Sequence, residues 1–469
     1  MNKEKLNIKQ PNSQAEPFKN IKTGSVKGQS NDLDKVQNSN LSCDREGIQT
    51  FDPQNSEGAT TEASPKVGYK KTKLGWIPAE WEVKELKEIG NVISGLTYSP
   101  DDVRPNGVLV LRSSNIQDSK LSFHDNVYVD PKKLNFNSLK NNDILICVRN
   151  GSRSLIGKST LIPNDLVGEA FGAFMTVFRS ESNIYLNQLF NSDFFYREVH
   201  KNIGATINSI NGGNLKKFKF PIPPPSEQKK IAAILTTWDS AIALQQDLIT
   251  AKQKFKKALT QQLLTGKKRF PGFEGEWEEV KLNDLGTIYT GGTPSSSIKK
   301  YWNGEITWYT PSEIRKAGKY ISVSERKITA LGLRKSSAKL FPKHTIVVCT
   351  RATIGEVSIS TIEASTNQGF KNICVNKDNN VEFVYYLLKT SKQEFLRKSS
   401  GSTFLELSTT DFRNMKFKVP TIYEQQKIAT TLSAADQELT LLQNQLIQLQ
   451  DQKRGLMQRL LTGEVRVKI

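Results

Sequence analysis

Apolar residues recur with alternating spacings of four and three near the end of the chain. This spacing places them on one face of an α-helix and is typical of a coiled-coil seam. It therefore predicts a long helix over residues 420–465. Nine of the ten seam positions are apolar: Ile428, Leu432, Ala435, Leu439, Leu442, Leu446, Leu449, Lys453, Leu456 and Leu460.

A second series of the same length predicts another long helix over residues 223–266. Seven of its ten positions are apolar: Ile231, Leu235, Trp238, Ile242, Gln245, Ile249, Lys252, Lys256, Leu259 and Leu263. We expect its packing face to be broader and to include Leu248 and Phe255. Two stripes of equal length most simply bury each other, which would give a rod of roughly 58 Å at about 1.5 Å per residue. The expected packing residues are Ile231, Leu235, Trp238, Ile242 and Leu259 in the first helix, and Ile428, Leu432, Leu439, Leu446 and Leu460 in the second.

The ends of both helices carry recognisable signals. Thr421 and Glu424 have the spacing of a capping box, and Pro225 is suited to the first position of the other helix. Gly266 and Gly463 are expected to terminate the two helices, because glycine readily adopts the left-handed conformation that follows a helix.

Each helix ends one copy of a longer unit that occurs twice. Trp81–Gly90 aligns with Trp277–Gly286 at an offset of 196, and later landmarks such as Leu264-Thr265-Gly266 and Leu461-Thr462-Gly463 keep an offset of 197. Matching β-rich runs carry Cys147 and Cys349, which are better explained as small buried hydrophobic residues than as catalytic thiols.

The segments between the helices predict two compact α+β domains. Short β-branched runs and glycine-rich turns fill residues 69–222 and 267–419. The expected fold class is therefore α+β, with two globular domains separated by two long helices that form a coiled-coil spacer. Residues 1–68 are polar and lack periodicity, so we expect a disordered N-terminal extension.

Composition favours a polyanionic partner. Lys plus Arg total 66 against 47 Asp plus Glu, a net charge of +19, and cations that neutralise phosphates release condensed counterions. No apolar run approaches the roughly 20 residues that span a bilayer, so no membrane association is expected. The four cysteines have no CxxC spacing and there are only three histidines. We therefore expect no metal site and a reducing, cytoplasmic location.

No catalytic motif is recognisable. The sequence contains no GxxxxGK[ST] phosphate loop, no GxSxG elbow and no HExxH helix. Glu227-Gln228-Lys229 resembles the tail of a nuclease metal motif, but a glutamate in the first turn of a helix already has a structural explanation through the helix dipole.

Loops after the matched β-runs are the candidates for binding DNA. Arginine and asparagine can contact base edges, while serine and glycine permit close approach to phosphates. Each residue could equally belong to a solvated turn or edge. The candidates are Arg149, Asn150, Ser152, Arg153 and Lys158 in the first copy, Arg351 and Thr353 in the second, Thr290, Thr293 and Ser295 in the TGGTPS loop, and Lys216, Lys219, Arg413 and Lys416 before the helices.

Taken together, these features resemble the specificity subunit of type I restriction–modification enzymes. The resemblance covers residues 69–469 and rests on a doubled set of motifs: a WE opening, the TGGTPS loop of the second copy, a Pro-x₃-Glu-Gln helix entry and a Leu-Leu-Thr-Gly exit. The long N-terminal extension departs from the family pattern, in which the first recognition domain begins near the start.

The resemblance implies two target-recognition domains that each read one half of an asymmetric bipartite DNA site. Antiparallel helices would set the spacing and dock two modification (methyltransferase) subunits, alongside separate restriction subunits. S-adenosylmethionine, ATP and magnesium would belong to those partners, with no cofactor in this chain. An approximate two-fold would place half-sites reached from one face about one helical turn, ~34–36 Å, apart.

Two alternatives from other classes stay open at this point. One is a fused or single-chain restriction enzyme whose active site is unrecognised. The other is a helical scaffold that joins protein partners without binding DNA.

Overall fold

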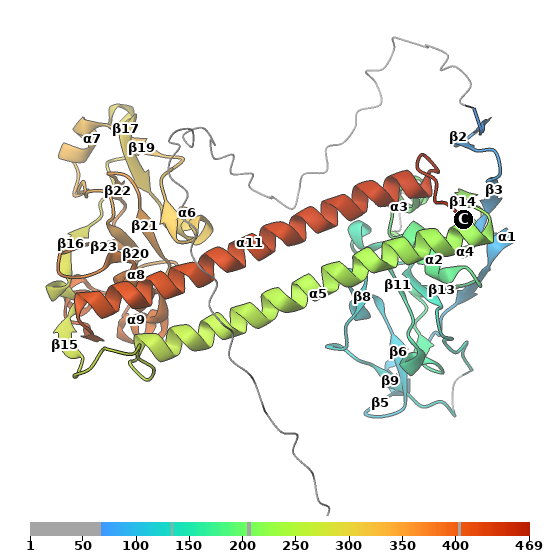
Figure 1. The fold of residues 1–469 in the computed structure, drawn as a ribbon, viewed down its shortest axis with the longest axis horizontal. Coiled ribbons are helices and arrows are strands. Elements are labelled where there is room, and N and C mark those ends of the chain that lie inside the picture. The colour runs from blue at the N-terminus through green and yellow to red at the C-terminus, as the bar shows by residue number, and fades with distance from the viewer. Residues whose placement is uncertain (1–66, 133–134, 204–207, 402–404) are drawn as a thin grey trace, which may run out of the picture. The chain divides into compact units, whose positions relative to one another are not determined.

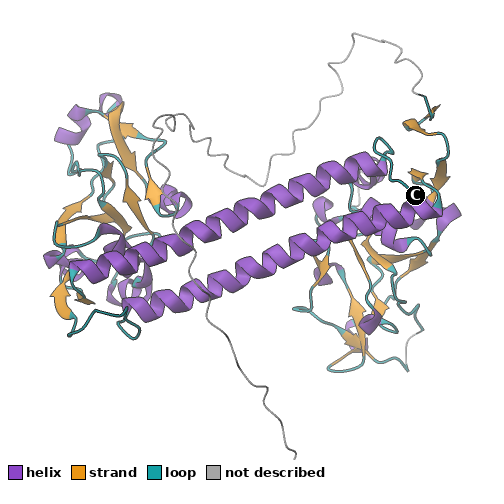
Figure 2. Ribbon diagram, in the orientation of Figure 1, coloured by secondary structure: helices purple, strands orange, loops and turns teal. Residues whose placement is uncertain are grey.

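The structure is a computed structural model that describes residues 67–132, 135–203, 208–401 and 405–469. Of the N-terminal extension expected over residues 1–68, residues 1–66 lie outside the described part of the chain. The remainder combines helices with small β-sheets (Figures 1 and 2).

Two helices of 40 residues each, α5 (Pro225–Leu264) and α11 (Ile422–Leu461), run side by side in opposite directions (Figure 1). Their polar contacts fix the direction. Lys256 pairs with Asp436, and Lys453 contacts Asp239 over 2.6 Å. The pairing residue numbers rise in one helix as they fall in the other. Both pairs are related by the 197-residue offset of the sequence repeat, so they are equivalent contacts about an approximate two-fold.

The helix ends follow the sequence in most respects. Pro225 occupies the first position of α5, as predicted. Gly266 and Gly463 follow the last turns with φ of 68° and 72°, which confirms the prediction of glycine-terminated helices. The prediction of a capping box at Thr421 is wrong, because the Thr421 side chain accepts no hydrogen bond from the helix.

Module 1, defined here as residues 69–222, contains three main sheets. The central one has the order β11-β10-β13-β4, and a second has the order β12-β6-β9-β5. The third pairs β14 with β3. Their bounds are β3 Glu82–Glu85, β4 Asn91–Ser94, β5 Val103–Arg104, β6 Val108–Leu111, β9 Tyr128–Val129, β10 Ile144–Cys147, β11 Ser159–Leu161, β12 Ala170–Phe171, β13 Met175–Arg179 and β14 Lys219–Ile222. Helices α2 (Asn183–Phe190) and α3 (Asp193–Asn202) follow β13.

Module 2, residues 278–419, repeats this plan. Its central sheet has the order β16-β23-β20-β21-β18, and smaller sheets have the orders β19-β17-β22 and β15-β24. The bounds are β15 Glu278–Lys281, β16 Gly286–Thr290, β17 Trp302–Tyr309, β18 Tyr320–Ile321, β19 Lys327–Ile328, β20 Ile346–Cys349, β21 Val357–Ser360, β22 Ser365–Thr366, β23 Phe370–Val375 and β24 Lys416–Val419. The helices used below are α6 (Pro311–Ala317), α8 (Val381–Thr390), α9 (Lys392–Lys398) and α10 (Thr409–Arg413).

Each end of the helix pair belongs to the core of one module. Ile231 and Leu235 are buried in module 1 together with Leu460 of α11. Ile428 and Leu432 are buried in module 2, where Leu259 packs at the edge. The predicted packing residues therefore bury against strands and short helices as well as against the opposite helix.

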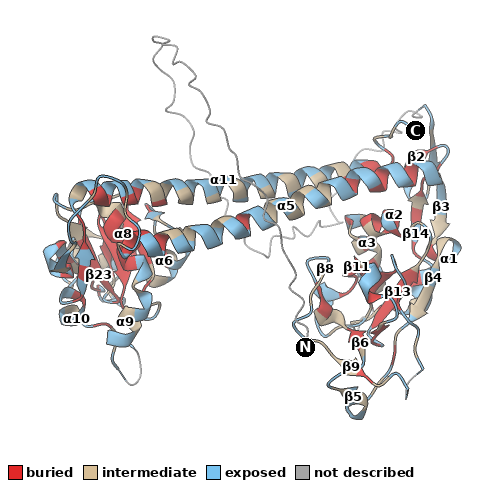
Figure 3. Ribbon diagram, turned by 60° about the horizontal axis from the view of Figure 1, so that its bottom comes forward, coloured by how far each residue is buried: buried red, intermediate tan, exposed pale blue. Residues whose placement is uncertain are grey.

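The middle of the helix pair is less buried than its ends (Figure 3). Four predicted packing residues are only half-buried: Trp238, Ile242, Leu439 and Leu446. The predicted broadening of the α5 face is wrong, since Leu248 and Phe255 are 42% and 61% exposed. The lysines that interrupt the seam instead reach acidic groups on the facing helix, including Lys252, which lies 2.5 Å from Glu438.

Candidate nucleic-acid interface

Three loops meet at one edge of module 2. The first loop follows β16, the second follows β20, and the third joins β22 to β23. The Gly292 amide donates to the Thr366 carbonyl over 2.9 Å, and the Thr350 amide donates to the Gly369 carbonyl over 2.8 Å. A side chain on Gly291 would place Cβ only 1.7 Å from the Asn367 carbonyl oxygen, so glycine is required there.

The same three loops meet in module 1. The Leu96 amide after β4 donates to the Phe171 carbonyl over 2.7 Å, and the Val148 amide after β10 donates to the Phe174 carbonyl over 3.0 Å. A Cβ on Gly95 would lie 2.2 Å from the Gly172 carbonyl oxygen. The close approach of the first and third loops is thus common to both modules.

The predicted first-copy loop lies at this edge and is internally ordered. Arg149 is exposed, and its guanidinium lies 5.1 Å from the centre of the Phe174 ring. Asn150 donates to Ser113 and accepts from the Ser152 amide, both over 2.9 Å, so its amide stabilises the loop itself. Ser152 and Arg153 are exposed.

Lys158 has a hydrogen-bond partner within module 1. Its ammonium donates to the Ile116 carbonyl oxygen over 2.7 Å. Burial lowers the pKa of this lysine. The side chain thus ties the residue before β11 to the segment after β6. That Lys158 contacts DNA stays a prediction.

The predicted residues of the second copy also come together. Thr293 is exposed and its hydroxyl donates to the Gln368 side-chain oxygen. Arg351 lies 3.9 Å from the Glu406 carboxylate. Thr290 ends β16 beside these loops. Ser295 continues from the loop, with its hydroxyl 2.9 Å from that of Ser297.

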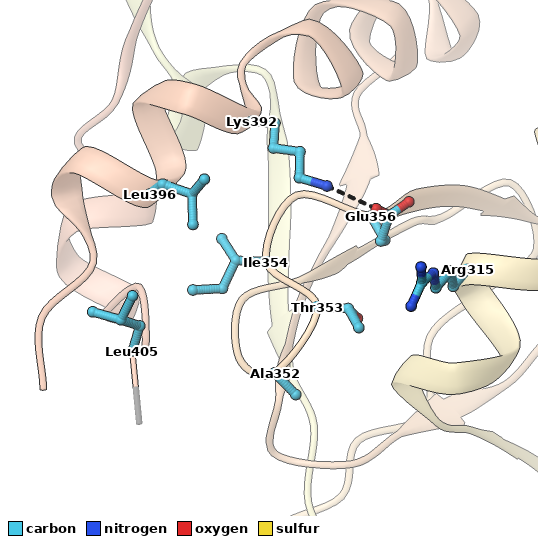
Figure 4. A pocket seen from close by; sticks show the side chains of 8 residues that line it. All are labelled: Arg315, Ala352, Thr353, Ile354, Glu356, Lys392, Leu396 and Leu405. Carbon is cyan, nitrogen blue, oxygen red and sulfur yellow. Dashed lines mark hydrogen bonds and ion pairs between the residues drawn. The ribbon is translucent and has the colours of Figure 1, made fainter. Parts of the chain in front are cut away.

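The loop after β20 borders a cavity of about 600 Å³ (Figure 4). Arg315 of α6 lies on one side and Leu396 of α9 on the other. Thr353 stands between them, and Lys392 donates to Glu356 over 2.9 Å. Cations, a hydroxyl and apolar carbons therefore line one open surface: Arg315, Ala352, Thr353, Ile354, Glu356, Lys392, Leu396 and Leu405.

The four basic residues predicted before the helices lie apart from these loops. Lys219 is on β14, 3.3 Å from Glu85, and Lys416 is on β24, 2.7 Å from Glu279. Those strands pair with β3 and β15, whereas the loops follow the far ends of β4 and β16. Lys216 and Arg413 end the short helices that precede β14 and β24. The structure therefore does not group these four residues with the loop candidates.

The sequence did not point to the turn that joins β12 to β13 in module 1 and β22 to β23 in module 2. This turn carries Phe174 in module 1, which is 56% exposed, and Asn367 and Gln368 in module 2. Comparing the copies at this turn, GAF against NQG, would have exposed a difference within a shared frame.

Two of the cysteines are buried in matching strands. Cys147 and Cys349 are fully buried in β10 and β20, as predicted. Burial raises the pKa of Cys349 to about 12 and also raises the pKa of Cys147. Within the described residues, no group of three or more His, Cys, Asp or Glu side chains could hold a metal ion. In the same part of the chain, no helix has the length and apolar character needed to cross a membrane.

Comparison with known proteins identifies the architecture. The family described as "Type I restriction modification DNA specificity domain" matches residues 78–252 and 274–451. The type I restriction enzyme MjaIX specificity subunit of Methanocaldococcus jannaschii is 44% identical over 165 residues, which span 34% of this chain and 38% of that protein. The putative type I restriction enzyme MjaX specificity subunit of the same organism is 28% identical over 85% of this chain and 97% of its own length.

A solved structure has a similar fold. It comes from work on complex assembly and conformational transition of the type I R-M system, and it has a TM-score of 0.57 at 16% identity. The alignment covers 83% of this chain and 99% of the solved chain. With two matched domains that cover most of its length, this chain belongs to the type I restriction–modification DNA specificity family. It has the architecture of a specificity subunit.

Proposed function

We propose that this chain is the DNA-binding specificity subunit of a type I restriction–modification complex, in which each module reads one half of an asymmetric bipartite site. The observation that carries the proposal is the recurrence of one three-loop edge in both modules with different exposed side chains. Arg149 and Phe174 stand at this edge in module 1, and Thr293 and Gln368 stand there in module 2. Equivalent scaffolds with different side chains fit the reading of two unlike half-sites.

The helix pair sets the distance between the readers. α5 begins in the core of module 1 and ends in the core of module 2. α11 begins in the core of module 2 and ends in the core of module 1. A helix rises about 1.5 Å per residue, so the number of turns between the cores determines the spacing of the half-sites. The pair formed by α5 and α11 is thus the proposed coiled-coil spacer between the two modules.

The outer faces of the helices are the proposed docking surfaces for two modification subunits. Exposed apolar residues on α5 include Leu244, Leu248 and Phe255. Spacings of four and seven place these three on one exposed face of α5. Restriction subunits would complete the assembly. Methyl transfer from S-adenosylmethionine and ATP- and magnesium-dependent cleavage belong to those partners, in the cytoplasm.

The test compares the purified chain alone with the chain assembled with its modification subunits. The assembly is expected to bind one bipartite sequence in preference to others, with affinity that falls linearly in a plot of log affinity against log salt. The chain alone should neither methylate DNA with S-adenosylmethionine nor cleave it with magnesium. Chemistry by the chain alone, or an assembly with no preference among sequences, would contradict the proposal.

A further inference from the structure

The turn between β22 and β23, Asn367–Gly369, is held in place on both sides. The loop after β16 contacts it through Gly291 and through the Thr293 hydroxyl, which donates to Gln368. The loop after β20 contacts it where the Thr350 amide donates to the Gly369 carbonyl over 2.8 Å. The turn therefore stands at the centre of the three-loop edge and has little freedom to move.

The side chains at this turn present amide groups beside a cation. Asn367, Gln368 and Arg351 border one cavity of about 270 Å³. The Asn367 side-chain oxygen accepts from the Gly369 amide over 2.8 Å, so this residue shapes the turn. Gln368 is exposed. Its oxygen keeps a second lone pair besides the one used by Thr293, and its NH₂ group has no hydrogen-bond partner among the described residues.

The equivalent turn of module 1, Gly172–Phe174, has the same support and different chemistry. Backbone hydrogen bonds from the loops after β4 and β10 flank it, over 2.7 and 3.0 Å. Its largest side chain is Phe174, which is 56% exposed and whose ring centre lies 5.1 Å from the Arg149 guanidinium. In the strand register Phe174 corresponds to Gly369, and Ala173 corresponds to Gln368. The two turns therefore present their large side chains at adjacent positions, an apolar ring in module 1 and a glutamine amide in module 2.

We propose that this turn is the base-reading element of each module, with Gln368 contacting an adenine and Phe174 contacting a thymine methyl group. A glutamine amide can donate to adenine N7 and accept from its N6 amino group, and an aromatic ring suits the thymine C5 methyl. The fixed backbone and the hydrogen bond from Thr293 hold the Gln368 side chain before DNA arrives, so less side-chain entropy is lost on binding. This inference rests on the proposed function and names the residues that carry its specificity.

The experiment measures base preference in the assembly of the full chain with its modification subunits. Duplexes randomised over the bound site are selected for binding and sequenced. Q368A should reduce the preference for adenine at one position by about 10- to 100-fold, leaving the other half-site unchanged. Q368E should prefer cytosine there, because a carboxylate accepts from the cytosine N4 amino group. F174A should relax one position in the opposite half-site.

A matched control is Q393A, which removes an exposed glutamine of α9 in the same module and should leave the selected sequence unchanged. Glutamate has nearly the shape of glutamine, so a switch of base preference in Q368E cannot be attributed to misfolding. If the wild-type assembly selects a bipartite sequence and Q368A and Q368E select the same one with equal stringency, the inference is wrong while the proposed function stands. If the wild-type assembly selects no sequence, the proposed function itself fails.

Discussion

Replacing Arg466 with alanine tests how the chain after α11 is fastened to module 1. Arg466 donates from Nε and Nη2 to the two carboxylate oxygens of Glu227, over 2.8 and 3.0 Å. Glu227 is completely buried in the first turn of α5, where it also accepts a hydrogen bond from the Trp81 indole over 2.9 Å. In R466A the carboxylate would lose its counter-charge while staying in the protein interior.

The expected cost follows from this geometry. Removing one partner of a buried ion pair typically costs about 3–5 kcal/mol. The Arg466 side chain is 33% exposed, so water can enter the vacated space and solvate part of the carboxylate. We therefore expect a loss of about 2–3 kcal/mol in the free energy of unfolding. At roughly 2 °C per kcal/mol for a large folded unit, Tm should fall by about 4–6 °C.

Thermal unfolding followed by calorimetry and circular dichroism measures the effect. R459A is the control, because Arg459 also lies near the end of α11 but forms an exposed ion pair. Its Nε lies 3.3 Å from the Glu464 carboxylate, and the two side chains are 58% and 57% exposed. Such surface pairs contribute at most about 1 kcal/mol. Adding E227Q to R466A should recover part of the loss, since a neutral amide needs no counter-charge and still accepts from the indole of Trp81.

Equal Tm values for R466A and R459A would refute this reasoning, as would a double variant no more stable than R466A. The approximate two-fold extends the prediction to module 2. Arg269, which corresponds to Arg466 at the 197-residue offset, donates to buried Glu424 over 2.9 and 2.7 Å. R269A should therefore also lower Tm more than R459A.

Three further predictions concern acid stability, thiol reactivity and spacing. Burial alone would raise the pKa of Glu382, but hydrogen bonds from Tyr320, Ser433 and Lys319 together outweigh it and lower the pKa below its ordinary 4.5. The ionised group therefore stabilises the fold above about pH 4.5, and this contribution is lost as pH falls through the folded pKa; Tm of E382Q should fall less steeply on acidification. Cys349, with a pKa near 12, should resist alkylation until unfolding, whereas half-buried Cys374 should react earlier; equal rates would contradict the burial. Deleting one heptad from the middle of both α5 and α11 should change the distance between half-sites, as read by binding selection, and leave their sequences intact.

Local patterns were sufficient to predict the long helices and the buried strand cysteines. The alternation of four and three depends only on helix geometry, and Gly266 and Gly463 mark helix ends through a backbone preference. Both signals lie within a few residues of the structure that they specify, so no knowledge of the tertiary fold is needed.

Contacts between distant segments could not be predicted in this way. Glu227 and Arg466 are 239 residues apart, and a glutamate in a first helical turn already has a local explanation. Lys158 looks like a free cation in a polar loop, but its partner is the carbonyl of Ile116, which another segment supplies. Gln368 lies in a short turn whose position between two other loops becomes visible only in the folded chain.

The most direct test of the central claim maps adenine methylation across a genome. Cells would express the modification subunits with either this chain or a variant in which residues 267–419 come from a relative with another specificity. We expect one half of the methylated sequence to change, while the other half and the spacing between them stay the same. A change in both halves, or in neither, would contradict the claim that two independent readers are mounted on one helical frame.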